Sequence, residues 1–521
     1  MLLQNYSRCQ VQEFNHMNKT KTGMMAVFAI MLMLATLAVA LIPAGESEAV
    51  SSSGSPANYQ DAKMWVLGNA NGDTNIDTDD KSVITSKIGT PVADAPMCDA
   101  NHDGSITADD VTFVESLIDG TADYCYYYNV DGAICKFTFY DKINTVVLHR
   151  CVVRSATILA NFDSNVTIVG MDSAPYGEVE FNVATNYPGC ENVGVLKEIS
   201  KENCATFVSE YQHDEYGFVI LVGTIDYYLP NLESWADEYG FQVVRIPTWE
   251  HHPTEGLLTT AYLFAGCGNS SGPGDEDCWQ HAQKYADWAF GILDKIKAKS
   301  TTIPEADRLK VLGVYTTTKN YEHVNHTRGP GSGDYENFAD AGGNNIATRF
   351  GPGSKADWTM ENIASYCGDL DILILMSANC FSTNAFNVTE DMKELTEKMD
   401  GYVKKGCKVY AMSWALNGAP FTVQMVYYAK IFMPNDTALQ AELPTMEQAW
   451  AKYLELIGWN SRTDISLDIQ KVCSDVNTPG VTTMDPNNSG GGSINMTLVG
   501  GAAAAAVIII AILAFAFMRK K

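Results

Sequence analysis

The sequence has few basic residues for its length of 521. Lys and Arg together number 35 against 62 Asp and Glu, which gives a formal net charge of −27 at pH 7. Nucleic-acid binding depends on clustered Lys and Arg that neutralise phosphates, so this balance argues against a nucleic-acid-binding protein. It also argues against a polybasic face that binds an anionic membrane. We interpret most of the acidic residues as a solvated surface.

Two familiar catalytic motifs are absent as well. The sequence contains no His-Glu-x-x-His zinc motif and no Walker-type phosphate loop. Its paired carboxylates lie in two acidic loops whose spacing suits a cation rather than a reaction. We therefore expect a protein that is not an enzyme.

The two ends of the chain predict its topology. Lys19 and Lys21 precede an uncharged stretch at 24–42, so residues 1–49 are predicted to be a signal segment; an uncleaved anchor is the alternative. Residues 496–518 carry no charge and are followed by three basic residues, which predicts a transmembrane helix with a cytoplasmic C-terminus. Everything between these ends is expected outside a cell membrane, held by a single span.

Cysteine usage fits that location. Of the 13 Cys, Cys9 precedes the signal segment, and the other twelve are an even number that permits full pairing. Cys267 and Cys278 bracket a Gly/Ser-rich stretch and are the pair we expect to be bridged. Free thiols are the alternative if the organism lives without oxygen.

Residues 61–124 contain an acidic repeat. Its second copy places Asp99, Asn101, Asp103, Ser105, Thr107 and Asp110 at positions 1, 3, 5, 7, 9 and 12 of an EF-hand loop, with Gly104 at position 6. Calcium takes six to eight oxygen ligands, and this spacing wraps them around one ion. The second copy therefore predicts a calcium site.

The first copy has the same register with Asn69, Asn71, Asp73, Asn75, Asp77 and Asp80. Asn69 replaces the first Asp and Thr74 replaces the Gly, so weaker binding is expected. An apolar-spaced helix is predicted after each loop. Two such loop–helix units resemble a dockerin, which implies calcium as cofactor and a cohesin-type protein partner. A structural calcium clasp between the linker and the rest of the chain, and Asx-rich turns without metal, are the alternatives.

The longer remainder alternates strand-like and helical runs. Apolar runs at 165–172, 217–226 and 240–249, and again at 309–315, 370–376 and 407–412, predict buried parallel strands. Apolar residues at helical spacing predict one long helix at 275–303 between them. The predicted fold class is α/β: two Rossmann-like lobes at 130–274 and 304–470 joined by that helix, besides the small all-α calcium module. A flexible stalk is predicted at 471–495, ahead of the transmembrane helix.

Several segments of this body, in order, resemble the class III substrate-binding proteins of ABC importers. They lie at 167–172, 192–199, 341–347, 358–363, 369–374, 419–432 and 449–459. The resemblance implies capture of an iron complex, such as an iron–siderophore, of haem, or of a corrinoid such as cobalamin. It also implies that one glutamate on each lobe docks on the importer's membrane subunits, and Glu198 and Glu361 match those positions.

Ligands of α/β folds bind beyond the carboxyl ends of the strands. The candidates there are Asp226, Tyr227, Tyr228, Trp249, His251, Tyr315, Ser377, Asn379 and Trp414. Aromatic side chains suit a flat ligand by stacking, although about half of such residues are ordinary lobe-core residues. His251-His252 and His323-x-x-His326 could ligate a metal.

These observations predict a membrane-anchored extracellular solute-binding protein that serves an ABC importer, on a surface of the archaeal type. One alternative is a surface scaffold or adhesion protein whose dockerin-like module docks a cohesin-type partner. Another is a hydrolase of surface polymers, because dockerins often accompany hydrolases.

Overall fold

The computed structural model describes residues 55–149, 152–153, 155–156, 159, 165–176, 181–213, 216–223, 229–247, 252–266, 278–316, 324–328, 335–350, 354–358, 369–377, 407–413, 416 and 418–462. The predicted signal segment, stalk and transmembrane helix lie outside these residues. Within them, no helix is both long enough and apolar enough to cross a bilayer.

The acidic repeat folds as two loop–helix units, as the sequence predicts. Helix α2 (Thr78–Lys87) follows the first loop and helix α3 (Ala108–Ile118) follows the second. Each begins with a capping box, in which the last loop residue and the third helical residue exchange side-chain and backbone hydrogen bonds. Short 3-10 turns η1 (Tyr59–Asp61), η2 (Val92–Asp94) and η3 (Pro96–Cys98) precede the loops.

A β-hairpin that we did not predict connects this module to the body. Strand β1 (Tyr124–Tyr128) pairs antiparallel with β2 (Ile134–Thr138). Along β1 the side chains alternate: Cys125 and Tyr127 are buried, whereas Tyr124, Tyr126 and Tyr128 are half-buried. The hairpin spans the boundary that we drew between the module and the first lobe.

The first lobe has a five-stranded parallel sheet in the order β5-β4-β3-β6-β7. Its strands are β3 (Ile143–Leu148), β4 (Val166–Met171), β5 (Glu191–Asn192), β6 (Gly217–Val222) and β7 (Gln242–Arg245). All six residues of β6 are buried, as expected of a central parallel strand. The order reverses at β3, which is the Rossmann-like arrangement that we predicted.

Helices of the first lobe lie between and after these strands. They are α5 (Ser173–Tyr176), α6 (Val183–Asn186), the 3-10 turn η4 (Leu196–Glu198), α7 (Lys201–Tyr211), α8 (Leu232–Tyr239) and α9 (Pro253–Phe264). Helix α8 ends at Gly240, whose φ of 80° gives the left-handed C-cap that glycine adopts without strain.

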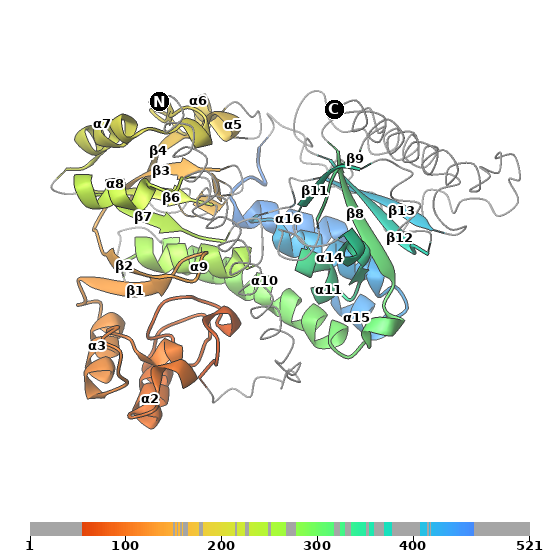
Figure 1. Cartoon of the computed structure of the whole chain (residues 1–521), viewed down its shortest axis with the longest axis horizontal. Helices are drawn as coiled ribbons and strands as arrows, with labels where there is room; N and C mark the ends of the chain where they lie inside the picture. Colours follow the sequence, from red (N-terminus) through yellow and green to blue (C-terminus); the bar gives the residue numbers. More distant parts are fainter. Residues whose placement is uncertain are drawn as a thin grey trace, which may run out of the picture. The chain divides into compact units, whose positions relative to one another are not determined.

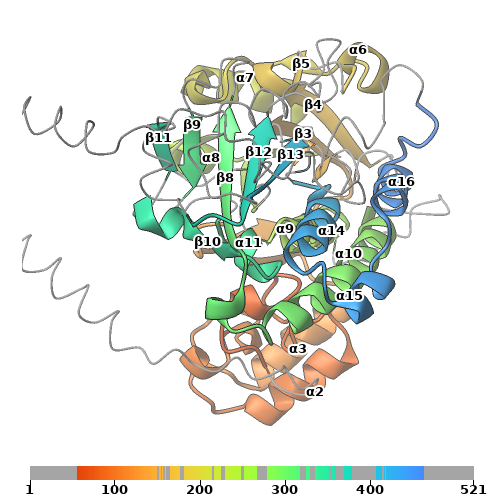
Figure 2. The same cartoon turned by 90° about the vertical axis from the view of Figure 1, so that its right-hand side faces the viewer.

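The second lobe has a mixed sheet in the order β11-β9-β8-β12-β13, with β10 paired to β8 (Figure 2). The strands are β8 (Lys310–Thr316), β9 (Val324–Arg328), β10 (Asn344–Asn345), β11 (Ser354–Trp358), β12 (Ile372–Ser377) and β13 (Lys408–Ser413). Strands β8, β12 and β13 are parallel as predicted. Strands β9 and β11, which we did not predict, are antiparallel. Trp358, the first residue of the segment 358–363 that carries part of the resemblance, ends β11.

Helices of the second lobe are α11 (Tyr335–Asp340), α14 (Phe421–Phe432), α15 (Thr437–Glu442) and α16 (Met446–Leu456), with 3-10 turns η6 (Glu305–Asp307) and η7 (Ile346–Phe350). Eleven residues of α14 are buried, which explains its almost uniformly apolar sequence.

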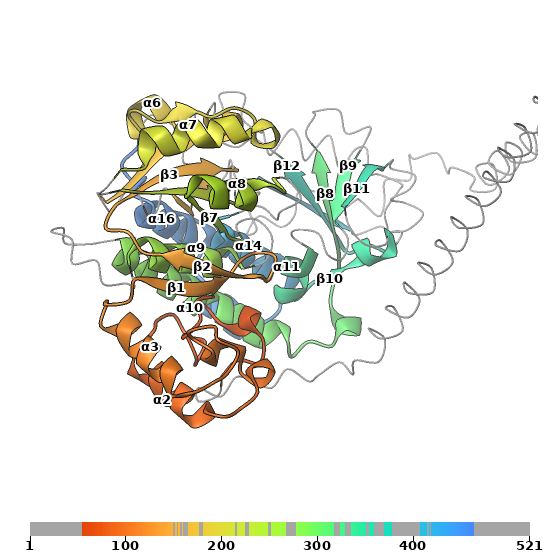
Figure 3. The ribbon, with the colours of Figure 1, turned by 60° about the vertical axis from the view of Figure 1, so that its left-hand side comes forward.

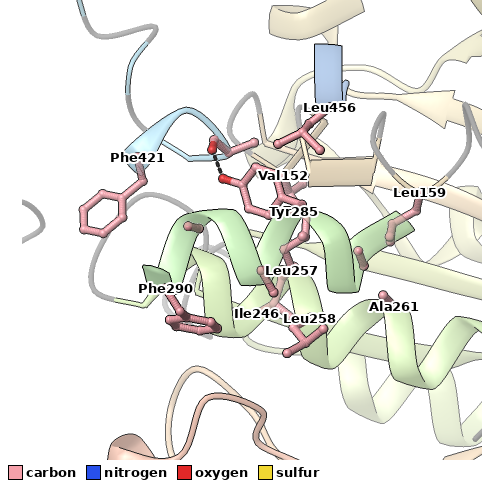
Figure 4. Packing of buried hydrophobic residues seen from close by; sticks show 14 of the residues in the cluster. Val152, Leu159, Ile246, Leu257, Leu258, Ala261, Tyr285, Phe290, Phe421 and Leu456 are labelled. Atoms are coloured by element: carbon pink, nitrogen blue, oxygen red, sulfur yellow. Dashed lines mark hydrogen bonds between the residues drawn. The ribbon is translucent and has the colours of Figure 1, made fainter. Parts of the chain in front are cut away.

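One long helix, α10 (Cys278–Ser300), joins the lobes, as the sequence predicts (Figure 1). It packs on α9 of the first lobe and on α14 and α16 of the second. The Tyr285 hydroxyl donates a hydrogen bond to the Ala419 carbonyl, drawn as a dashed line in Figure 4. Around it Val152, Leu257 and Leu456 form part of a continuous apolar core. This packing makes the junction between the lobes a buried one.

Four cysteines that could have formed disulfides are free thiols: Cys98, Cys135, Cys190 and Cys204. The full pairing that an even number permits is therefore not formed, and the alternative of free thiols holds for these four. Burial raises the pKa of the Cys190 thiol to about 12 and that of the Cys204 thiol to about 11, which makes both unreactive near neutral pH. Cys278 donates its thiol hydrogen to the Ala261 carbonyl, and Cys267 lies outside the described residues.

Candidate functional site

The parallel strands of the first lobe end together at one edge of the sheet. Val147 pairs with Met171, and Leu148 pairs with Val222, which in turn pairs with Arg245. The strand order reverses at β3, so the residues after β3, β4 and β6 flank the place where such folds bind ligands. Those residues begin with His149, Asp172 and Gly223.

His149 has an unusual backbone at this place. Its φ is 93°, in the region that non-glycine residues rarely adopt. Its N–H donates to Oδ1 of Asp172 at 2.9 Å, and its carbonyl accepts from the N–H groups of Val152 and Val153. Asp172 is only 4% exposed, so β4 holds the turn after β3 through a buried carboxylate.

We did not predict His149 as a site residue. Strand β3 has no distinctive sequence motif, and positive φ at a histidine has no sequence signature. The one available signal was Asp172, whose position at the end of a predicted strand marked a polar group at this edge.

The parallel strands of the second lobe also end together. Ser377 at the end of β12 pairs with Thr316 of β8 on one side and with Ser413 of β13 on the other. Tyr315 lies one residue earlier in β8 and pairs with Met376. The backbones of Tyr315 and Ser377 therefore lie at the same edge of this sheet, and their role in ligand binding stays a prediction.

Most of the other predicted ligand-binding residues lie outside the described residues. These are Asp226, Tyr227, Tyr228, Trp249, His251, Asn379 and Trp414. The structure describes the ends of β6, β7, β12 and β13, which these residues follow along the chain. The position of the seven residues beyond those strand ends stays a prediction. Of the histidines proposed as metal ligands, His323 lies outside as well, and His326 lies in β9 opposite Tyr315.

Of the two predicted docking glutamates, Glu198 is described. It is exposed and lies in the 3-10 turn η4, just ahead of α7. Val195, beside it, has an exposed fraction of 49%, which is high for a large apolar side chain. Glu361 lies outside the described residues.

His252 lies at the start of α9, directly after the connection that carries Trp249 and His251. Its Nδ1 lies 3.0 Å from Oε1 of Glu255. Burial lowers the pKa of His252, but the adjacent Glu255 carboxylate raises it, and the net shift is upward. At Gly256, an added Cβ would lie 2.4 Å from the Pro247 carbonyl oxygen, so this connection depends on close backbone contact.

The two acidic loops have matching hydrogen bonds. In the first, the Asp80 carboxylate accepts from the backbone N–H groups of Asn71 and Asp77. In the second, the Asp110 carboxylate accepts from those of Asn101 and Thr107. The register that we read from the sequence is therefore the register of the folded loops.

Position 1 of the first loop has an unsatisfied oxygen. Asn69 is fully buried and its Nδ2 donates to the carbonyls of Met64 and Asp73, but its Oδ1 has no hydrogen-bond partner. A buried polar atom without a partner is costly, and an amide oxygen is a ligand that calcium accepts. Burial, and to a smaller extent the nearby Asp73 and Asp77 carboxylates, raise the pKa of the Asp80 carboxyl to about 7.

Side-chain oxygens of Asn, Ser and Thr make up much of each predicted ligand set. Across the part of the chain that the structure describes, no group of three or more His, Cys, Asp or Glu side chains is arranged to hold a metal ion. In the second loop, the Asp99 carboxylate does not lie in such a group but accepts hydrogen bonds from the backbone N–H groups of Asp103 and Gly104. The donor set fits calcium by its oxygen chemistry and its spacing rather than by converging carboxylates.

One sequence match to a catalytic motif needs comment. Residues 268–272 read Gly-Asn-Ser-Ser-Gly, which fits the Gly-x-Ser-x-Gly spacing of a nucleophile elbow. That motif functions on a turn from a strand into a helix, whereas this stretch follows helix α9 and itself lies outside the described residues. The match gives no support to a hydrolase.

Comparison with known proteins gave only remote structural likenesses. No known family model matches the sequence, and no curated protein matches it. An ABC transporter solute-binding protein from Sulfurospirillum deleyianum has a TM-score of 0.44 at 15% identity, over 64% of this chain and 95% of that one. The Ceue protein of Helicobacter pylori, solved with Ni(II) bound, has a TM-score of 0.41 at 11% identity, over 65% and 97%. A periplasmic haem-binding protein of Vibrio cholerae has a TM-score of 0.36 at 14% identity, over 58% and 99%. With TM-scores below 0.5, these likenesses assign no ligand to this chain.

Proposed function

We propose that this protein is a non-enzymatic, membrane-anchored extracellular solute-binding protein. It binds an iron complex, haem or a corrinoid between its two lobes and delivers it to an ABC importer. The observation that carries the proposal is the pair of sheets joined by α10, in each of which parallel strands end together at one edge. The reversal of strand order at β3 places His149 and Asp172 where α/β folds bind ligands.

Docking on the importer's membrane subunits is assigned to Glu198 and Glu361. The exposure of Glu198 beside the apolar Val195 supports a contact surface there. Charged groups at such a surface steer association more than they add affinity. Replacement of Glu198 by Gln should therefore slow association with the importer while leaving ligand binding unchanged.

An absorbance titration tests the ligand class. The full chain, solubilised in detergent with calcium present, is titrated with haem, with cobalamin and with ferric siderophores. Saturable binding of one of them at one equivalent supports the proposal and names the ligand. Absence of binding by all three rejects these ligand classes.

We also propose calcium as the ion of both acidic loops. The orphaned Oδ1 of Asn69 and the matching hydrogen bonds of the two loops support it. Loop residues would hold the ion, with Asp99, Asp103 and Asp110 as the charged ligands of the second loop. Calorimetric titration of the full chain with calcium should show two sites, the first loop being the weaker.

A scaffold that docks a cohesin-type partner is the second candidate function. The exposed faces of α2 and α3, which include Thr78, Thr85 and Thr112, leave room for a protein on that side of the module. Calcium-dependent capture of the full chain by a purified cohesin would support this candidate, and the absence of ligand binding in the absorbance titration would favour it further.

A further inference from the structure

The first acidic loop holds the segment that enters it, residues 63–67. The N–H of Lys63 donates to the Gly72 carbonyl at 2.9 Å, and Nδ2 of Asn69 donates to the Met64 carbonyl at 2.9 Å. Gly72 and Asn69 are both loop residues, and Asn69 carries the orphaned oxygen. The conformation of this loop therefore fixes the position of residues 63–67.

Residues 63–67 lie against β1 of the hairpin and form one isolated antiparallel bridge with it, between Val66 and Tyr127. The N–H of Leu67 donates to the Tyr126 carbonyl at 2.8 Å, and the N–H of Tyr128 donates to the Trp65 carbonyl at 2.9 Å. In Figure 3 the hairpin lies between the helices of the module and helix α9. Residues 63–67 therefore lie on the side of the module that contacts the first lobe.

The β1–β2 hairpin contacts β7, the edge strand of the first lobe. The Tyr127 hydroxyl donates to the Val243 carbonyl of β7 at 3.1 Å. The Gln242 side chain also exchanges two hydrogen bonds with the backbone of Thr138. Both strands of the hairpin are therefore bonded to β7.

Trp65 connects the segment to the start of α9. The backbone N–H of Trp65 donates to Oγ1 of Thr259 at 2.9 Å, and the residue is 2% exposed. The centre of its ring lies 5.5 Å from that of His252, the N-cap of α9. His252 directly follows the connection that contains the predicted ligand residues Trp249 and His251.

Lys63 connects the same segment to the inter-lobe helix. Its Nζ donates to Oδ2 of Asp294 in α10 at 2.7 Å and lies 4.8 Å from the centre of the Phe290 ring. The pair is partly exposed and contributes little energy alone. The ion pair matters because it joins residues 63–67 to α10, and α10 packs against both lobes.

The second loop makes a weaker contact with the body. The centre of the His102 ring lies 5.2 Å from that of Tyr126, and the His102 side chain is 41% exposed. Residues 93–98, which enter the second loop, bond to the first unit through the N–H of Gly68 and the Met97 carbonyl. The two loops are alike in sequence and hydrogen bonding but differ in their connection to the body.

We propose that calcium in the first loop fixes residues 63–67 and, through them, β7, the start of α9 and α10, so that calcium stiffens the ligand-binding body. The ion in the second loop stabilises the module alone. This inference rests on the proposed calcium binding. Because coupling between two sites is reciprocal, a ligand bound against β7 and the start of α9 would in turn tighten calcium binding to the first loop.

Hydrogen exchange of the full chain in detergent, with and without calcium, tests the inference. Calcium should slow exchange of the backbone at 63–67, 242–247 and 253–264. At a calcium concentration about 100 times the dissociation constant, mass action allows slowing of up to about 100-fold. Calorimetry on the same sample establishes that calcium binds.

Matched variants separate the two loops. Asp73→Ala and Asp103→Ala remove the same position from each loop, and each carboxylate accepts from the N–H group two residues later. Asp73→Ala should abolish the calcium effect at 253–264, whereas Asp103→Ala should preserve it. Thr259→Val should keep both calcium sites and reduce that effect, since Trp65 loses its acceptor.

The outcomes are distinguishable. Calcium binding without slower exchange at 253–264, or equal effects of Asp73→Ala and Asp103→Ala, would overturn this inference and leave the calcium proposal standing. No heat of calcium binding to the unsubstituted protein would overturn both.

Discussion

At the scale of single residues, His149 is the clearest departure from ordinary backbone geometry in the first lobe. A non-glycine residue at a φ of 93° costs of order 1–3 kcal/mol, and such residues cluster at functional sites. The Asp172 carboxylate and the N–H groups of Val152 and Val153 hold it in place. The strain lies where the strand order of the sheet reverses, which is the reason to connect it with ligand binding.

Replacement of His149 by Gly should separate stability from binding. Glycine accepts positive φ without strain, so the free energy of unfolding should be unchanged or higher by about 1 kcal/mol, as measured by urea denaturation. Ligand affinity should fall at least about tenfold if the imidazole contacts the ligand.

His102→Gly is the matched control, because His102 also has positive φ, at 56°, but lies in the second acidic loop. It should leave ligand affinity unchanged. Equal ligand affinities of the His149→Gly variant and the unsubstituted protein would contradict a role for His149 in the site.

Asp369 should make the free energy of unfolding depend on pH in the acid range. Its carboxylate accepts two hydrogen bonds from Arg349 and one from Lys310, and these bonds hold the pKa of Asp369 well below its usual range. A lowered folded-state pKa stabilises the fold above the unfolded-state value of about 3.9, and that stabilisation is lost as pH falls below it.

Asp369→Asn should therefore lower the free energy of unfolding at pH 7 by at most about 1 kcal/mol, because the group is well exposed. The difference from the unsubstituted protein should shrink as pH falls below about 4. Chemical denaturation at a series of pH values measures it, and a difference that does not vary with pH would count against the ion pairs as its source.

At the scale of elements, the connection from β7 to α9 depends on Gly256. A Cβ there would lie 2.4 Å from the Pro247 carbonyl oxygen and 2.9 Å from the Pro247 ring. Gly256→Ala should therefore displace α9 and cost about 1–3 kcal/mol. Gly291→Ala in α10 is the control, since an added Cβ there meets nothing within 4 Å and should stabilise the helix. A neutral Gly256→Ala would show that α9 moves freely relative to β7.

Elements with strong periodic patterns were predictable from sequence. Helices α2 and α3 follow the two acidic loops as predicted, and α10 and the apolar strands β4, β6, β8, β12 and β13 lie within a few residues of their predicted bounds. The hairpin β1–β2 was missed because its alternation is carried by tyrosines, which suit exposed and buried positions alike. The antiparallel β9 and β11 were missed because their direction depends on the pairing of β9 with β8 and of β11 with β9, which the local sequence does not encode.

The candidate site was less predictable than the fold. The strand ends that carry Tyr315 and Ser377 were located, since parallel strands of one sheet end at the same edge. His149 was not, because its role arises from the strand order and from a backbone angle. The loop residues of the calcium repeat were located individually, because their spacing along the chain is itself the geometry of the site.

At the scale of the whole molecule, the two lobes share a buried junction. Tyr285 of α10 donates to the Ala419 carbonyl, and Phe181 of the first lobe lies 6.3 Å, ring to ring, from Trp459 near the end of the second. A junction packed in this way favours small adjustments of the lobes over wide opening. The ligand would then be held by strand ends contributed from both lobes.

The most direct test of that claim is hydrogen exchange of the full chain with and without haem, cobalamin or a ferric siderophore, whichever binds in the absorbance titration. A ligand held between the lobes should slow exchange in both lobes at once. The expected places are 145–149 and 217–223 of the first lobe, and 310–316, 372–377 and 408–413 of the second. Protection confined to one lobe or to the acidic module, or no binding of any of the three, would contradict a ligand held between the lobes.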